Sequence, residues 1–155
     1  MPAALATKPR TRPEPVEIEK KHTVLIIDDD DTLSDVLSHR LKQQGFQTVA
    51  AYSGKSGLEQ AKHQPPSAVI LDLNLPDADG LSICAELADS HETCTTPIII
   101  LSGKDQPGLV RSCRAAGCHY FLRKPYDPSA LLVLIRQAIA DSSGWTPTAN
   151  EEQEA

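Results

Sequence analysis

Four consecutive aspartates, Asp28 to Asp31, directly follow a short apolar run, and Asp72 directly follows another. Carboxylates brought together repel one another, and a divalent cation relieves that repulsion. Oxygen ligands without His or Cys suit Mg²⁺. Asp30 and Asp31 fit the start of a helix, where acidic residues are favoured. We therefore interpret Asp28, Asp29 and Asp72 as candidate metal ligands.

Two more polar residues, Ser102 and Lys124, also follow apolar runs. A metal ion, an ammonium group and a hydroxyl are the groups that stabilise the oxygens of a phosphoryl group. A carboxylate can act as a nucleophile and form an acyl phosphate. Asp72 is the single acid after the central apolar run, so it is the candidate acceptor of a phosphoryl group.

Strands and helices that alternate along the chain would position these residues. Apolar runs predict strands at 24–27, 46–51, 68–71, 98–101 and 120–122. Apolar residues at helical spacing predict a helix after each strand. Gly45 and Gly117 are suited to end the first and fourth helices, and Ser53 and Asp127 to begin the second and fifth. The predicted apolar positions are Leu33, Val36, Leu37 and Leu41; Leu58 and Ala61; Leu81, Cys84, Ala85, Leu87 and Ala88; Leu109, Val110, Cys113 and Ala116; and Leu131, Leu132, Leu134, Ile135, Ala138 and Ile139.

This alternation predicts an α/β fold, with a five-stranded parallel, doubly wound sheet of (βα)5 type. Continuous apolar runs are typical of parallel strands that are covered on both faces. In such sheets, ligands bind beyond the carboxyl ends of the strands. Asp28, Asp72, Ser102 and Lys124 would all lie at that edge.

Four segments carry a family resemblance: Val24 to Asp29, Val69 to Gly80, Pro97 to Gly103, and Gly117 to Tyr126. Together, and in this order, they resemble the receiver domains of two-component response regulators over about residues 22–141. The resemblance implies a flavodoxin-like fold with strand order 2-1-3-4-5, like that of chemotaxis regulators.

The resemblance also implies a role for each matching residue. Asp72 would be the phosphoacceptor, Asp29 a direct Mg²⁺ ligand, and Asp28 a ligand acting mainly through water. Asn74 would offer its backbone carbonyl to the metal, and Lys124, before a typically cis Pro125, would bind the phosphoryl oxygens. Ser102 and Phe121 would form the switch that reports phosphorylation. Phe121 stands where the family often has Tyr, and Ser102 where it often has Thr. Asn74 and Lys104 would lie at the rim and influence the lifetime of the acyl phosphate.

The family resemblance implies partners as well. A sensor histidine kinase or a histidine phosphotransfer protein would donate the phosphoryl group. A downstream protein would read the face made by the fourth helix, the fifth strand and the fifth helix, and a phosphorylation-dependent homodimer is a further expectation. The domain would catalyse its own phosphorylation and dephosphorylation without being a turnover enzyme for a metabolite.

Two alternatives compete with this interpretation. An aspartyl-phosphate hydrolase of the haloacid dehalogenase type needs a second acid two residues after the nucleophile, and Asn74 occupies that position. A degenerate receiver used only for binding would be expected to lack Asp72, Asp29 or Lys124, and all three are present.

Length and charge set the remaining bounds. With 155 residues and a net charge of −6, the chain suits one domain and has no basic stripe for nucleic acid. The longest apolar run, Ala130 to Ile135, is too short to span a membrane, and the beginning has no secretory signal, so we expect a cytoplasmic protein. The four cysteines lack close pairing and are expected to be free thiols.

We expect a flexible Pro-rich tail over 1–21, a receiver over 22–141 with no room for an output domain, and a flexible acidic tail over 142–155.

Overall fold

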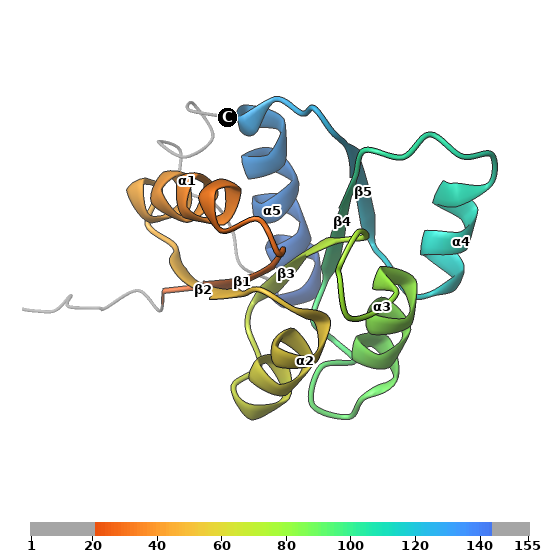
Figure 1. Ribbon diagram of the computed structural model, residues 1–155. Coiled ribbons are helices and arrows are strands. Elements are labelled where there is room, and N and C mark those ends of the chain that lie inside the picture. The colour runs from red at the N-terminus through yellow and green to blue at the C-terminus, as the bar shows by residue number, and fades with distance from the viewer. Residues whose placement is uncertain (1–20, 144–155) are drawn as a thin grey trace, which may run out of the picture.

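The computed structural model describes residues 21–143 and contains five parallel strands alternating with five helices (Figure 1). The strands are β1 (Thr23–Ile27), β2 (Gln47–Ala51), β3 (Ala68–Asp72), β4 (Ile98–Ser102) and β5 (Tyr120–Arg123). The helices are α1 (Asp31–Gln43), α2 (Gly54–His63), α3 (Gly80–Asp89), α4 (Leu109–Ala115) and α5 (Pro128–Ser143). The sheet order is β2-β1-β3-β4-β5, which confirms the predicted doubly wound, flavodoxin-like fold.

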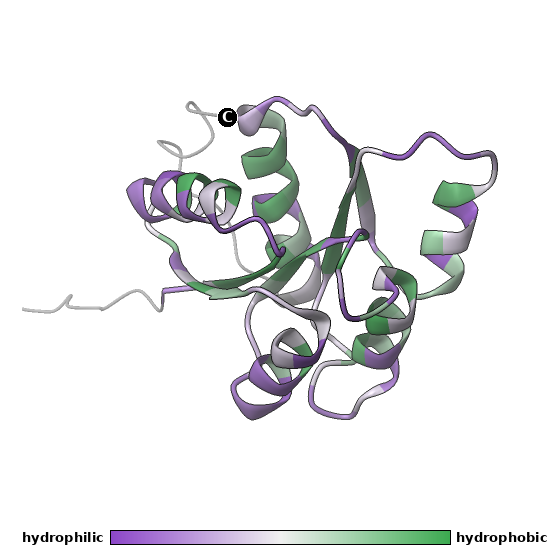
Figure 2. Cartoon of the chain, viewed as in Figure 1, coloured by the Kyte–Doolittle hydropathy of each residue, from purple (hydrophilic) through white to green (hydrophobic). Residues whose placement is uncertain are grey.

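Helices cover both faces of the sheet, so the central strands β1, β3 and β4 bury side chains on both sides, while the edge strands β2 and β5 are only partly buried. Leu25 and Val69 lie in a core under α2, α3 and α4, while Ile26 and Ile70 lie in a second core under α1 and α5. In Figure 2 the hydrophobic colour follows the strands and the inner faces of the helices. This arrangement explains why the strands read as continuous apolar runs.

The predicted helix boundaries agree closely with the structure. Ser53 begins α2, with its Oγ accepting a hydrogen bond from the Ser56 N–H, and Asp127 accepts one from the Ser129 N–H at the start of α5. Gly45 follows α1 with a φ of 96°, a left-handed conformation that glycine adopts without steric cost. Helix α5 continues to Ser143, two residues past the predicted end of the receiver.

The predicted apolar face of α1 was partly wrong. Leu33 and Val36 are 50% and 54% exposed, and the helix instead buries Ser34, Leu37 and Leu41. These three lie on one line along the helix, and Leu33 and Val36 are each one residue before it, which rotates them away from the sheet. Val110 of α4 was also predicted to be buried and is 43% exposed.

Three of the four cysteines, Cys84, Cys113 and Cys118, are buried, whereas Cys94 is exposed, and all four are free thiols as predicted. No helix among residues 21–143 has both the length and the apolar character that a membrane crossing requires. The predicted tails fall largely on 1–20 and 144–155, which lie outside the described residues.

Candidate phosphoryl-transfer site

Three carboxylates meet at the carboxyl edge of the sheet. Strands β1 and β3 are neighbours, and Ile27 is in register with Leu71, so the next residues, Asp28 and Asp72, lie side by side. Oxygens of Asp28, Asp29 and Asp72 all lie within 4.8 Å of one another. Asp28 and Asp72 are buried, and Asp29 is exposed to solvent. The fold thus brings together the three acids that the sequence singled out.

Burial of Asp28 has an electrostatic consequence. Loss of solvent raises the pKa of the Asp28 carboxyl, and the nearby charges of Asp72 and Asp29 raise it further. A hydrogen bond of 3.0 Å from the Asp30 N–H to Asp28 Oδ1 opposes that rise, as does the charge of Lys124. These opposing effects do not cancel the effect of burial, so the pKa of Asp28 stays above its usual value.

Lys124 is the cation that the structure places against the carboxylates. Its Nζ atom lies 3.4 Å from Oδ1 of Asp72 and 3.7 Å from Oδ2 of Asp28. The Lys124 N–H donates a 2.8 Å hydrogen bond to the Ser102 carbonyl, which attaches the end of β5 to the end of β4. The Lys124–Pro125 peptide bond is cis, as the resemblance implied.

Ser102 is buried at the end of β4, one residue beyond the position that pairs with Asp72. Its Oγ accepts a 3.0 Å hydrogen bond from the Lys104 N–H. Within residues 21–143, the structure gives Ser102 no hydrogen bond to the three carboxylates. Phe121, in β5, is half-buried and packs against the core beneath α2, α3 and α4.

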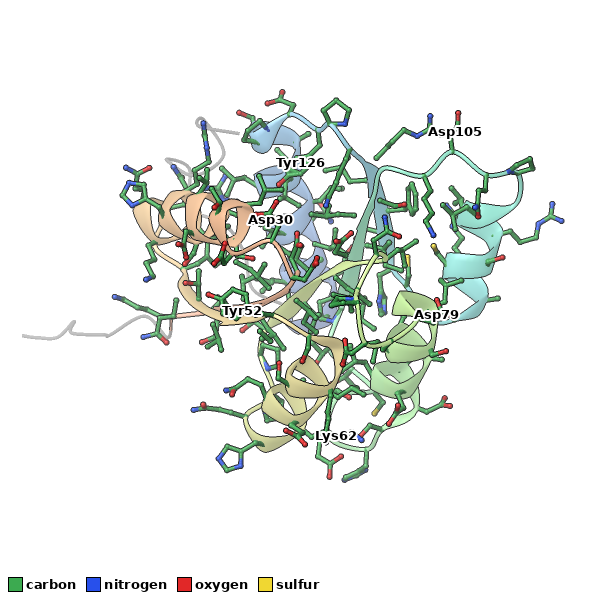
Figure 3. All side chains as sticks on the ribbon, in the orientation of Figure 1. Asp30, Tyr52, Lys62, Asp79, Asp105 and Tyr126 are labelled. Atoms are coloured by element: carbon green, nitrogen blue, oxygen red, sulfur yellow. The ribbon has the colours of Figure 1, made fainter. Side chains whose placement is uncertain are left out.

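Asn74 lies in the loop between β3 and α3. Its N–H is 3.4 Å from Oδ1 of Asp72, a long hydrogen bond, and its backbone pairs with Asp79 in an isolated bridge. The Asn74 side chain is exposed. Side chains of the loops that surround this edge, including Asp30, Asp79 and Tyr126, can be followed in Figure 3.

The donor set fits a hard divalent cation. Three carboxylates converge without His or Cys, and Mg²⁺ prefers such oxygen ligands. In the part of the chain that the structure describes, this is the one group of three or more acidic, His or Cys side chains close enough to share a metal ion.

A cavity of about 480 Å³ adjoins the acids, and two of its lining residues were not anticipated. Tyr126 lines it from the loop before α5, and burial raises the pKa of its hydroxyl. Ser34 lines it from α1, and its buried Oγ has no hydrogen-bond partner among the described residues. The position of Tyr126, two residues after Lys124, indicates in the sequence that it lies near the site. Nothing in the sequence marks Ser34 in this way. Asp28, Asp72 and Lys124 also line the cavity, and its remaining walls are apolar side chains.

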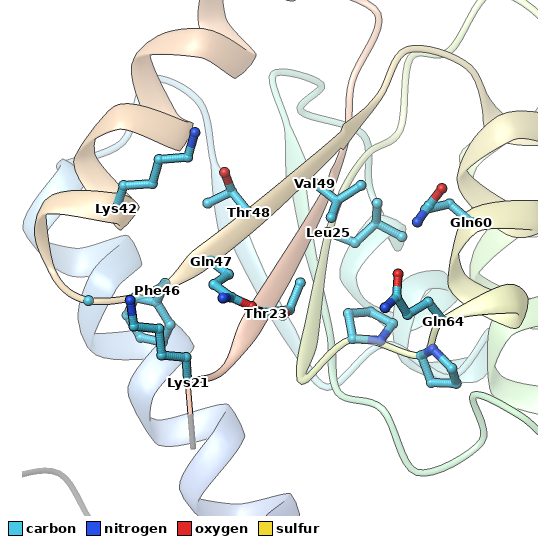
Figure 4. A pocket seen from close by; sticks show the side chains of 13 residues that line it. Lys21, Thr23, Leu25, Lys42, Phe46, Gln47, Thr48, Val49, Gln60 and Gln64 are labelled. Carbon is cyan, nitrogen blue, oxygen red and sulfur yellow. Dashed lines mark hydrogen bonds between the residues drawn. The ribbon is translucent and has the colours of Figure 1, made fainter. Parts of the chain in front are cut away.

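A larger cavity, of about 630 Å³, lies away from this site (Figure 4). It borders β2 and is lined by residues such as Lys42, Phe46, Gln60 and Gln64. None of the three clustered carboxylates lines it. Size alone would therefore direct attention to the wrong part of the molecule.

Comparisons with known proteins agree with this geometry. Residues 24–136 match the family model described as the response regulator receiver domain. The transcriptional regulatory protein CseB of Streptomyces coelicolor is 33% identical over 116 residues, which cover 75% of this chain and 48% of that protein. The chain therefore spans about half the length of this curated relative.

Solved structures agree as well. A response regulator from Chloroflexus aurantiacus is 33% identical, with a TM-score of 0.73, over 78% of this chain and 99% of that one. The chemotaxis protein CheY4 of Vibrio cholerae is 25% identical, with a TM-score of 0.72, over 77% of this chain and 99% of that one. Apart from Thr23, the matched segment includes all five strands, and it includes all three clustered carboxylates. The chain belongs to the response regulator receiver domain family of two-component systems.

Proposed function

We propose that Asp72 accepts a phosphoryl group from the phosphohistidine of a sensor histidine kinase or phosphotransfer protein. The observation that carries this proposal is the pairing of Lys124 Nζ with Asp72 Oδ1 at 3.4 Å, beside two further carboxylates. Both described polar contacts of the Asp72 carboxylate, from Lys124 and from the Asn74 N–H, involve Oδ1. Oδ2 is accordingly our candidate for the attacking atom.

In the proposed reaction, the P–N bond to the donor histidine breaks as a P–O bond to Asp72 forms. The histidine leaves with the electron pair of the broken bond and takes up a proton. Asp28, Asp29, Asp72 and the Asn74 carbonyl would hold Mg²⁺, which neutralises charge on the phosphoryl oxygens when bound. Lys124 would pair with a phosphoryl oxygen in place of the Asp72 carboxylate.

The proposed switch begins at Ser102. Its hydroxyl would give up the hydrogen bond that it accepts from the Lys104 N–H. It would instead donate a hydrogen bond to the phosphoryl group, because phosphorylation adds three acceptor oxygens to the site. Phe121 would then turn inward, and the face of α4, β5 and α5 would shift toward an active population. A downstream protein or a second copy of the chain would bind that face. The domain acts as a signalling switch and not as a metabolic enzyme.

The phosphoryl donor would dock over α1. Leu33 and Val36 are exposed apolar side chains on this helix, and Leu33 also lines the cavity that contains Asp72 and Lys124. A protein that brings a histidine to Asp72 through this cavity would cover Leu33. Burial of exposed apolar side chains by a partner would stabilise such a complex.

The test is intact-mass measurement after incubation with Mg²⁺ and acetyl phosphate. We expect the wild-type protein to gain the mass of one phosphoryl group and Asp72→Asn to gain none. Asp105→Asn is the matched control, because Asp105 is an exposed acid that pairs with Arg123 and is not one of the three clustered carboxylates. An unchanged mass for folded wild-type protein with Mg²⁺ would overturn the proposal.

A further inference from the structure

The loop after β3 contacts the start of a helix that precedes it in the chain. The Asp77 carboxylate accepts hydrogen bonds from the N–H groups of Gly54 at 2.8 Å and Lys55 at 3.1 Å, the first two residues of α2. A helix leaves such N-terminal donors without internal partners. Ser53 covers the next donor, the Ser56 N–H, at 3.1 Å. Side chains from two separate loops therefore complete the first turn of α2.

The same loop is tightly folded between Asp77 and the candidate metal site. Asn74 pairs with Asp79 across the loop. Gly80 lies so close to Leu73 that a Cβ atom at Gly80 would be 2.6 Å from the Leu73 Cα. A loop closed in this way has few alternative conformations, so a contact at Asp77 restrains the position of Asn74.

The start of α2 is also connected to the acidic cluster through the end of β2. The Asp28 N–H donates a 3.1 Å hydrogen bond to the carbonyl of Ala51, the last residue of β2. Only two residues separate Ala51 from Gly54. Gly54 also packs closely against Ala78, since a Cβ atom there would be 3.0 Å from the Ala78 Cβ. The start of α2 thus links the loop that holds Asp28 to the loop that holds Asn74.

We propose that Asp77 is a positioning residue for the metal site. It anchors the β3–α3 loop to the start of α2 and so holds the Asn74 carbonyl in place. This inference rests on the proposed function, because it concerns the same Mg²⁺ site. Asp77 itself would not touch the metal or the phosphoryl group. Residues that orient ligands without binding the metal commonly influence metal affinity strongly.

The test compares Mg²⁺ affinity, measured by isothermal titration calorimetry, in Asp77→Ala, Ser53→Ala and the wild type. Both substitutions remove a cap from the first turn of α2, but only Asp77 connects that turn to the loop of Asn74. We expect Asp77→Ala to raise the dissociation constant for Mg²⁺ roughly tenfold and Ser53→Ala to leave it near the wild-type value. Asp77→Asn, which keeps one acceptor oxygen, should recover part of the affinity.

A second measurement separates positioning from general loss of structure. At saturating Mg²⁺, the rate at which acetyl phosphate modifies Asp77→Ala should return to within about twofold of the wild-type rate, because only the metal affinity is impaired. Equal dissociation constants for Asp77→Ala and wild type, or an equal increase in Ser53→Ala, would overturn the role of Asp77. Absence of Mg²⁺ binding by the wild type would instead overturn the proposed function.

Discussion

The ammonium of Lys124 lies closer to Asp72 than to Asp28, at 3.4 Å against 3.7 Å, although both carboxylates are buried beside it. One cation therefore serves two acids, and Asp29 adds a third carboxylate to the cluster. Among the described residues, three carboxylates at this site are therefore matched by one ammonium group. This imbalance leads to predictions about metal binding, stability and phosphorylation.

Replacement of Lys124 should change metal binding and signalling in opposite directions. Lys124→Ala removes the positive charge that opposes a second cation, so we expect Mg²⁺ to bind several-fold more tightly. The same variant should be phosphorylated without adopting the active conformation, because it lacks the ammonium group that would pair with a phosphoryl oxygen. Calorimetry with Mg²⁺ and amide NMR spectra with and without beryllofluoride would measure the two effects. Lys104→Ala is the control, and weaker Mg²⁺ binding by Lys124→Ala would contradict the electrostatic argument.

The buried Asp28 carboxylate should destabilise the metal-free protein at neutral pH. Burial raises its pKa in the folded state, so folding favours the protonated form, and stability falls as the pH rises through that pKa. Asp28→Asn removes the charge and should increase the free energy of unfolding by about 1 kcal/mol at pH 7. The difference should vanish below the usual pKa range of aspartate, where both states are protonated.

Urea denaturation in EDTA, repeated at several pH values, would measure this effect. Asp35→Asn is a suitable control, because Asp35 is an exposed acid on α1. A loss of stability in Asp28→Asn at pH 7 would mean that hydrogen bonds of the carboxylate outweigh its desolvation.

The four thiols should differ sharply in reactivity. Burial raises the pKa of Cys84 to about 12 and that of Cys118 to about 11, and it raises the pKa of Cys113 as well. Because the thiolate is the reactive form, a thiol-specific reagent at pH 8 should modify only the exposed Cys94 quickly. Cys94→Ser should abolish the fast phase, and urea should expose the remaining thiols. A second fast phase in native Cys94→Ser would show that the core around α3 and α4 opens readily.

Two glycines near the site should respond differently to alanine. A Cβ atom at Gly80 would lie 2.6 Å from the Leu73 Cα, a backbone atom that can move only if the loop shifts. A Cβ atom at Gly103 would meet nothing closer than the Lys124 Cβ at 3.9 Å. We expect Gly80→Ala to lower the free energy of unfolding by about 1–3 kcal/mol and Gly103→Ala to change it little. Thermal denaturation of both variants would check this, and equal melting temperatures would show that the β3–α3 loop relaxes.

Much of the fold was predictable because both faces of the sheet are covered. Residues such as Ile26 and Ile70 must be apolar whichever side they face, so the strands stand out as continuous runs. Surface helices were less predictable. In α1, Leu33 and Val36 have helical spacing with Leu37, yet only contact with the sheet and α5 decides which side of the helix is buried. Ser34, a polar residue, therefore occupies a buried position that composition would assign to an apolar side chain.

By itself, the sequence determined which residues end the strands, and hence that Asp28, Asp72, Ser102 and Lys124 share one edge of a parallel sheet. It did so because apolar runs mark the strands, and the alternation of strands with helices makes the strands parallel. Tertiary structure alone decided that Lys124 reaches both buried acids and that Asp77 completes the first turn of α2. These contacts depend on how separate loops pack against one another, and no local pattern encodes that packing.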